Sequence, residues 1–311
     1  MKPRVLGLVG PTASGKSALA LRAAQALQGE IVCMDSMQVY RGLDIGTAKP
    51  SRAEQALVPH HLLDVVGPGQ AFSVAEYRGL AQAAIAGILK RGRLPILCGG
   101  TGLYLRALSQ NPQLGGTPGD PAIRARWQAL AGQSGNQAVH EALRRRDPAR
   151  AAQLHPNNLR RVIRALEVLE LTGQPMSAQR LSDPGEGPYD LRLYALRWPR
   201  EQLYQRVDDR VARMLQEGLV EEVRGLVAAG LSPQAQSMQG LGYKELLPFL
   251  SGQASLADCQ QLLARRTRNY AKRQLTWFQA DPRVRWLEAQ EGLDANLARI
   301  IKENEADETK D

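Results

Sequence analysis

Eight consecutive residues near the start of the sequence form a pattern that binds phosphate groups. Glycines let such a loop curl until its backbone N–H groups face an anion, and the helix that follows directs its positive end to the same place. The lysine then contacts a terminal phosphate, and the last hydroxyl holds Mg²⁺. The pattern therefore predicts a phosphorylated ligand with Mg²⁺, which need not be ATP. Its residues are Gly10, Pro11, Thr12, Ala13, Ser14, Gly15, Lys16 and Ser17.

A second polar segment begins at Asp35, directly after an apolar run, and continues through Ser36, Met37 and Gln38. A carboxylate in this place can ligate magnesium, anchor a ribose, act as a general base or cap a turn. Position alone favours the cap or the magnesium role. Asp35 is expected to overlook the phosphate loop from a neighbouring strand.

The next strand-like run ends without an acidic residue. ATP-hydrolysing proteins with this loop usually carry a carboxylate there for Mg²⁺ and water. Here Leu94 to Cys98 is followed by Gly99, Gly100, Thr101 and Gly102, which places a hydroxyl and bare backbone beside the phosphates. Such a site suits a reaction in which diphosphate leaves better than it suits hydrolysis of a nucleotide.

Arg210 is notable because of helical geometry. On a helix expected from about 200 to 218, it falls within the apolar stripe of Leu203, Val207, Val211 and Met214. A guanidinium on a core-facing stripe needs an anion. An anionic ligand and a structural partner such as a neighbouring aspartate explain it equally well.

Alternating strand-like and helical runs must position these groups. This alternation, from the start to about residue 110, predicts an α/β fold with a parallel sheet covered by helices on both faces. Ligands of such sheets collect at the carboxyl ends of the strands. The expected strands are Val5 to Val9, Glu30 to Met34, His61 to Val65 and Leu94 to Cys98, with helices such as Ala18 to Leu27 and Ala75 to Lys90.

The 311 residues exceed one ordinary domain, so a second unit is expected. Residues 1–110 form the first part of the phosphate-loop core. Residues 111–190, with loop signals at 115–119 and 183–188, are expected to be a helical insertion without strands. Residues 191–311 complete the core with a strand at Leu191 to Trp198, after which only helices are expected.

The net charge of +9 suits a polyanionic partner such as RNA or a membrane face, although a merely soluble basic protein is equally consistent. Two helices concentrate basic residues, and each could instead be a solvated charged face. One carries Arg160, Arg161 and Arg164; the other carries Arg265, Arg266, Arg268, Lys272 and Arg273 among the aromatic residues Tyr270 and Trp277.

The three cysteines, Cys33, Cys98 and Cys259, are an odd number, which fits a reducing cytoplasm. Nothing is long enough to cross a bilayer, so no membrane association is expected. The sequence also has no heptad seam, which favours a monomer.

Together these segments resemble the tRNA dimethylallyltransferase family, the bacterial tRNA isopentenyltransferases. The resemblance covers nearly the whole chain, and the set of motifs in this order is highly specific. Besides the phosphate loop, the motifs are Asp35-Ser36-Met37-Gln38-Val39-Tyr40, Asp44-Ile45-Gly46-Thr47-Ala48-Lys49-Pro50, His60-His61-Leu62-Leu63-Asp64, Gly99-Gly100-Thr101-Gly102-Leu103-Tyr104, His155-Pro156-Asn157-Asn158, Arg164-Ala165-Leu166-Glu167, Gly242-Tyr243-Lys244-Glu245 and Tyr270-Ala271-Lys272-Arg273-Gln274.

The resemblance implies transfer of a dimethylallyl group from dimethylallyl diphosphate to N6 of adenosine 37, in tRNAs that read codons beginning with U. It implies that the phosphate loop holds diphosphate, with Lys16 and Ser17 serving diphosphate and Mg²⁺. Asp35 would accept the amine proton, while Thr101 and Arg210 would steady the departing diphosphate.

The resemblance also assigns a tRNA-binding set, and the insertion would grip the anticodon stem. This set is Asp35, Ser36, Met37, Gln38, Thr101, Arg124, Arg160, Arg161, Val162, Ile163, Arg164, Gln239, Gly240, Leu241, Gly242, Tyr243, Lys244 and Glu245.

Two other classes of function compete with this interpretation. A small-molecule enzyme, either a kinase or an isopentenyltransferase acting on AMP, is disfavoured because neither needs so many basic residues or the insertion. An RNA-binding protein without catalysis is disfavoured because Lys16, Asp35 and Thr101 are all present.

Overall fold

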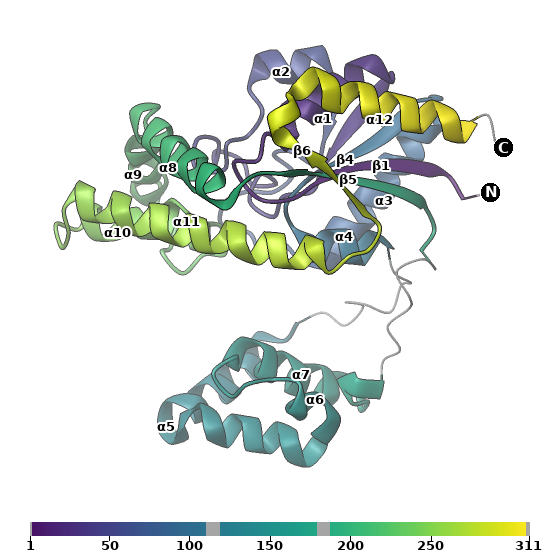
Figure 1. Ribbon diagram of the computed structural model, residues 1–311. Helices are drawn as coiled ribbons and strands as arrows, with labels where there is room; N and C mark the ends of the chain where they lie inside the picture. The colour runs from purple at the N-terminus through teal and green to yellow at the C-terminus, as the bar shows by residue number, and fades with distance from the viewer. Residues whose placement is uncertain (1, 110–118, 179–186, 309–311) are drawn as a thin grey trace. The chain divides into compact units, whose positions relative to one another are not determined.

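The computed structural model describes residues 2–109, 119–178 and 187–308, and the chain divides into two compact units (Figure 1). Met1–Ser109 and Pro188–Asp311 form one, called here the core unit; Gln110–Gly187 form the other, called the helical unit. The loops expected at 115–119 and 183–188 fall mostly outside the described residues.

The core unit is built on one parallel sheet in the order β3-β2-β4-β1-β5-β6. This arrangement confirms the predicted α/β fold. The strands are β1 (Arg4–Val9), β2 (Gly29–Cys33), β3 (His60–His61), β4 (Leu94–Gly99), β5 (Asp190–Arg197) and β6 (Val284–Glu288).

Helices cover both faces of this sheet, which explains why β1 is buried and without polar side chains from Val5 to Val9. Leu6 and Leu8 pack with Leu19 on one face, whereas Val5 and Val9 pack with Ile85 on the other. The first face carries α1 (Lys16–Ala26) and α12 (Leu293–Glu308), and the second carries α3 (Val74–Lys90) and α4 (Gly102–Ser109) (Figure 1).

Two expectations about strands were wrong. β3 ends after two residues because Leu62 and Asp64 adopt the left-handed backbone conformation, with φ of 65° and 57°, and a strand cannot continue through them. Helices are also not the only elements after β5, because β6 adds a sixth strand that pairs with β5. Two of its five residues, Arg285 and Glu288, are charged and exposed, and charged side chains are common on short edge strands.

The remaining helices of the core unit lie near the carboxyl ends of the strands. α8 and α11 pack against each other, as do α9 and α10 (Figure 1). These elements are α2 (Arg52–Leu57), α8 (Arg200–Gln216), α9 (Leu219–Ala228), η2 (Ser237–Gln239), α10 (Tyr243–Leu250), α11 (Leu256–Gln279) and η3 (Ala289–Glu291). No helix within the three described ranges is long and apolar enough to span a membrane.

The helical unit contains no strand in its described part, residues 119–178. Val139 and Leu143 of its first helix pack against Val162 and Leu166 of its longest later helix. That first helix is interrupted at Gly135, whose φ is 79°. The elements are α5 (Pro121–Arg146), α6 (Pro148–Ala152), α7 (Leu159–Thr172) and η1 (Met176–Ala178).

Candidate active site

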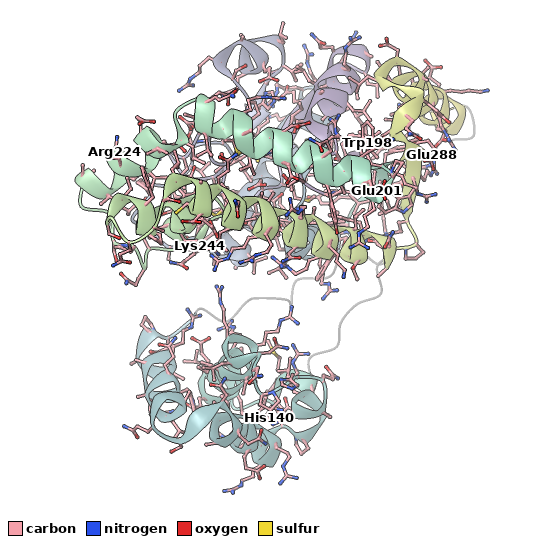
Figure 2. The ribbon with its side chains drawn as sticks, turned by 60° about the vertical axis from the view of Figure 1, so that its left-hand side comes forward. His140, Trp198, Glu201, Arg224, Lys244 and Glu288 are labelled. Carbon is pink, nitrogen blue, oxygen red and sulfur yellow. The ribbon has the colours of Figure 1, made fainter. Side chains whose placement is uncertain are left out.

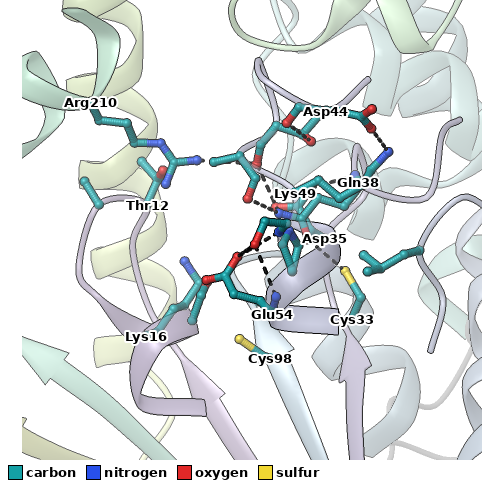
Figure 3. Close-up of a pocket in the computed structure, with 18 of the residues that line it drawn as sticks. Thr12, Lys16, Cys33, Asp35, Gln38, Asp44, Lys49, Glu54, Cys98 and Arg210 are labelled. Carbon is teal, nitrogen blue, oxygen red and sulfur yellow. Dashed lines mark hydrogen bonds and ion pairs between the residues drawn. The ribbon is translucent and has the colours of Figure 1, made fainter. Parts of the chain in front are cut away.

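A cavity of about 760 Å³ opens at the carboxyl ends of β1, β2 and β4. The phosphate loop forms one wall, and the turn after β2 forms another. Further polar groups come from α8, from α11 and from the segment 44–55 (Figure 3). Lys16, Asp35, Gln38, Arg210 and Gln274 all line this cavity. The structure thus brings together groups that the sequence places nearly 260 positions apart.

Left-handed backbone positions curl the phosphate loop. Gly10, Ala13 and Gly15 have φ of 121°, 62° and 94°. This curvature turns the loop back on itself before α1 begins at Lys16, whose Nζ donates a hydrogen bond to the Pro11 carbonyl at 3.1 Å. The loop geometry is therefore that of an anion cradle at a helix N-terminus.

Lys16 and Arg210 bring two cations to the same cavity. Burial lowers the pKa of Lys16, and nearby Arg210 lowers it further, while Cys98 and Asp35 raise it. Burial likewise lowers the pKa of Arg210, against a smaller opposing effect of Asp35. Both pKa shifts mean that burial costs the charged forms more than the nearby negative groups return. A bound anion would stabilise both charges.

Arg210 points into the cavity from α8 (Figure 3). One nitrogen lies 3.4 Å from the Thr47 carbonyl. The neighbouring carboxylates are engaged elsewhere, because Asp208 pairs with Arg268 at 2.5 Å and Asp209 accepts from Gln205 at 2.8 Å. Within the described ranges, no carboxylate forms an ion pair with Arg210. Arg210 therefore has no structural carboxylate partner among these residues, and an anionic ligand for it stays a prediction.

Asp35 lies across the cavity from Lys16 and Arg210 (Figure 3). Its Oδ1 accepts from the backbone N–H groups of Met37 at 2.8 Å and Gln38 at 3.4 Å. The residue therefore does cap the turn after β2. The cap fixes the carboxylate in place and leaves its oxygens at the cavity wall, so capping and base catalysis are compatible.

Thr101 supports the same turn. Its Oγ1 accepts from Ser36 N at 3.2 Å, and its side chain also hydrogen-bonds with Tyr270 of α11. The β4 end, the Asp35 turn and α11 are thereby joined at one hydroxyl.

Gln274 was missed as a site residue in the sequence, although it occupies the centre of this arrangement. Its Oε1 accepts from Thr12 N at 2.8 Å and its Nε2 donates to the Gly100 carbonyl at 2.9 Å. The side chain thus bridges the phosphate loop and the turn after β4. The sequence feature that could have indicated it is a polar amide on the buried stripe of α11, between Ala271 and Phe278.

The cavity offers few ligands of its own for Mg²⁺. Within residues 2–109, 119–178 and 187–308, no group of three histidine, cysteine or acidic side chains could hold a metal. Ser17 is exposed in the first turn of α1 and provides one hydroxyl. Mg²⁺ commonly binds through one or two protein oxygens together with substrate phosphates and water, and this site fits that pattern.

The predicted tRNA-binding residues differ in exposure. In the core unit, a Cβ on Gly240 would lie 2.6 Å from the Met37 side chain, so two predicted segments adjoin. The side chains of Tyr243 and Glu245 are fully buried, and Glu245 pairs with Arg266 at 2.8 Å. These two side chains therefore cannot contact tRNA directly, and they stabilise the exposed residues around them.

In the helical unit, Arg160 and Arg161 are exposed, whereas the side chains of Val162 and Ile163 are buried. Arg124 and Arg164 are anchored on the buried carboxylate of Glu167, at 2.8 and 2.6 Å. Arg160 and Arg161 are therefore the members of this set best placed to contact a polyanion.

Comparisons with known proteins agree with this geometry. The family described as IPP transferase matches residues 38–281, and the family described as isopentenyl transferase matches residues 3–64. The tRNA dimethylallyltransferase 1 of Pelobacter propionicus is 51% identical over 300 residues, covering 96% of this chain and 97% of the relative. The tRNA dimethylallyltransferase of Pelotomaculum thermopropionicum is 47% identical, covering 94% and 93%.

Solved structures give the same result. The tRNA isopentenylpyrophosphate transferase from Bacillus halodurans is 42% identical with a TM-score of 0.72, covering 96% of this chain and 94% of that one. A eukaryotic dimethylallyltransferase acting on tRNA is 30% identical with a TM-score of 0.78, covering 92% and 74%. The predicted resemblance is confirmed: this chain is a transferase and belongs to the IPP transferase family, alongside the tRNA dimethylallyltransferases.

Proposed function

We propose that this chain transfers a dimethylallyl group from dimethylallyl diphosphate to N6 of adenosine 37, in tRNAs that read codons beginning with U, and releases diphosphate. One observation carries the proposal. A single cavity holds the Asp35 carboxylate on one side and two cations, Lys16 and Arg210, on the other. Transfer of an allylic group to an amine needs these opposite charges at the two ends of the reaction.

The chemistry follows from that arrangement. The adenine nitrogen bonds to the allylic carbon as the bond from that carbon to the diphosphate oxygen breaks, and the electron pair leaves with diphosphate. Asp35 accepts the proton that the amine loses. Lys16, Arg210 and the N–H groups of the loop at Gly10 to Ser17 stabilise the charge on the leaving group. Thr101 keeps the Asp35 turn in place.

Ser17 would hold Mg²⁺ together with diphosphate oxygens. When bound, the ion would neutralise part of the charge on the leaving group. The adenine must leave its stack to reach Asp35, because a stacked base does not expose its edge to a side chain in a closed cavity.

The exposed Arg160 and Arg161 would contact tRNA phosphates from the helical unit, and the segment Gln239 to Glu245 would do so from the core unit. A cytoplasmic monomer would meet both substrates directly, and no membrane contact is needed.

The test uses purified protein, labelled dimethylallyl diphosphate and Mg²⁺. An unmodified tRNA transcript with adenosine 37 and an anticodon reading a U-initial codon should become labelled. The same transcript with guanosine 37 should not, because it lacks the 6-amino group. Free AMP should also stay unlabelled, since its single phosphate cannot span the basic surfaces as a tRNA backbone does. Equal labelling of AMP would assign the chain to small-molecule prenylation instead.

A further inference from the structure

Glu222, on α9, occupies an anion site made from backbone. Its Oε2 accepts from the N–H groups of Asp44 at 2.9 Å and Ile45 at 2.8 Å. Its Oε1 accepts from Gly46 N at 3.1 Å and from the Tyr243 hydroxyl at 2.7 Å. Three consecutive N–H groups that converge on one carboxylate form the same kind of nest that binds free anions. Here the protein fills the nest with its own side chain.

Tyr243 closes this nest. Its ring packs so tightly on Gly46 that a Cβ there would lie 2.7 Å from the ring atoms. Burial, and then the nearby Glu222 carboxylate, raise the pKa of Tyr243 far above its ordinary value, so the hydroxyl remains a donor. The carboxylate is thus held by four donors from two separate segments, while Glu222 remains only partly covered from solvent.

The nest belongs to the loop Asp44 to Lys49, which we call the strap. Two backbone carbonyls of the strap contact side chains of the active site. Thr47 O receives the 3.4 Å contact from Arg210 and a hydrogen bond at 3.0 Å from Gln38 Nε2. Ala48 O accepts from the same Gln38 nitrogen at 3.1 Å.

Lys49, at the other end of the strap, pairs with Asp44 at 2.5 Å and also has contacts outside the strap. Lys49 Nζ donates to the Tyr40 carbonyl at 2.9 Å and pairs with Asp64 at 2.6 Å. Glu222 is therefore the group from outside the strap that holds the backbone N–H groups of Asp44 to Gly46, and Thr47 follows directly after this nest.

We infer that Glu222 is a positioning residue for the transfer reaction. By filling the nest it fixes the Thr47 carbonyl, and that carbonyl directs Arg210 toward the departing diphosphate. This inference rests on the proposed function. It assigns Glu222 no contact with either substrate, so its removal should lower kcat and leave the KM for tRNA unchanged.

The decisive experiment is rescue of Glu222→Ala by acetate. Truncation at Cβ removes a fragment with the shape and charge of acetate, and the partly open nest can take that ion from solution. The variant should lose about 10- to 100-fold in kcat, as expected for a misplaced charge at a reacting centre. Acetate should restore a substantial part of this loss, whereas chloride at equal ionic strength and neutral acetamide should not.

A matched control lies one residue away. Glu221 is exposed on the same helix and pairs at 3.3 Å with Arg224, which Figure 2 marks on the outside of α9. Glu221→Ala should keep wild-type kcat and show no response to acetate. Acetate should likewise have no effect on the wild-type enzyme.

Glu222→Gln keeps the shape and removes the charge, so it provides a test even if the alanine variant does not fold. It should lose kcat without any acetate rescue, because the amide still occupies the nest. Full activity of either Glu222 variant, or equal rescue by chloride, would overturn the inference. Inactive wild-type and Glu221→Ala enzymes would instead count against the proposed function itself.

Discussion

The two ends of the core sheet differ in how their buried charges are paired. At the amino end, the buried carboxylate of Glu30 on β2 accepts from Arg91 at 3.0 and 2.7 Å and lies 2.7 Å from His61. At the carboxyl end, Lys16 and Arg210 share a cavity, and no carboxylate within the described ranges pairs with either cation.

The pKa shifts show what this difference means. The Arg91 hydrogen bond lowers the pKa of Glu30 to about 2, so its neighbours favour the charged form. Burial lowers the pKa of Lys16 and of Arg210, so their surroundings disfavour the charged forms. The charge of Glu30 stabilises the fold, whereas the charges of Lys16 and Arg210 have no carboxylate partner among the described residues and could receive an anionic ligand.

The largest expected effect comes from Asp35→Asn. The amide can still cap the turn through its oxygen, but it cannot accept the amine proton. The kcat should fall by about 10³-fold, within the range for loss of a general base. Single-turnover transfer of the labelled prenyl group measures the rate, and filter binding should show unchanged affinity for tRNA. A variant with the wild-type rate would remove Asp35 from the mechanism.

Arg210→Gln should lower activity while it raises stability. The kcat should fall by about 10²-fold because one stabilising charge at the leaving group is lost. The free energy of unfolding should rise by about 1 kcal/mol, since a desolvated cation without a carboxylate partner is removed. Steady-state kinetics and urea denaturation measure the two quantities. A loss of stability would mean that Arg210 is already compensated in the free enzyme.

Glu30→Gln should have the reverse effect. At pH 7 the free energy of unfolding should fall by about 2 kcal/mol, with kcat unchanged. Because the folded-state pKa lies below the ordinary 4.5, the stability from this carboxylate is present above pH 4.5 and disappears as the pH falls toward 2. Urea denaturation at several pH values should therefore show the two proteins converging in acid. A constant difference would assign the effect to packing.

Much of this organisation could be predicted from residue patterns. The strands β1, β2 and β4 are apolar runs that end in polar or glycine-rich turns, whereas β5 alternates, and the structure confirms all four to within one or two residues. Arg210 was recognisable because a guanidinium within an apolar stripe conflicts with the helical pattern. A conflict of this kind involves only residues of one helix, so it can be detected in a single sequence.

Other features had no comparable signal. β6 is a five-residue edge strand that contains two charged residues, Arg285 and Glu288, and it depends on β5 for its pairing. The left-handed conformations of Leu62 and Asp64 shorten β3, and leucine rarely adopts this conformation, so its residue type does not indicate it. The nest around Glu222 consists of backbone N–H groups, which every non-proline residue has, so nothing in the side chains of the strap marks it.

The bridge from Gln274 to Thr12 has a consequence for protein synthesis. The two residues are 262 positions apart. At ordinary translation speeds, a ribosome adds Gln274 roughly 15 to 50 s after it has added the phosphate loop. An unfinished polypeptide therefore carries the glycine loop without the amide that ties it to the turn after β4. A chain broken off before α11 would have the loop without its tether, so we expect transferase activity only from the nearly completed polypeptide.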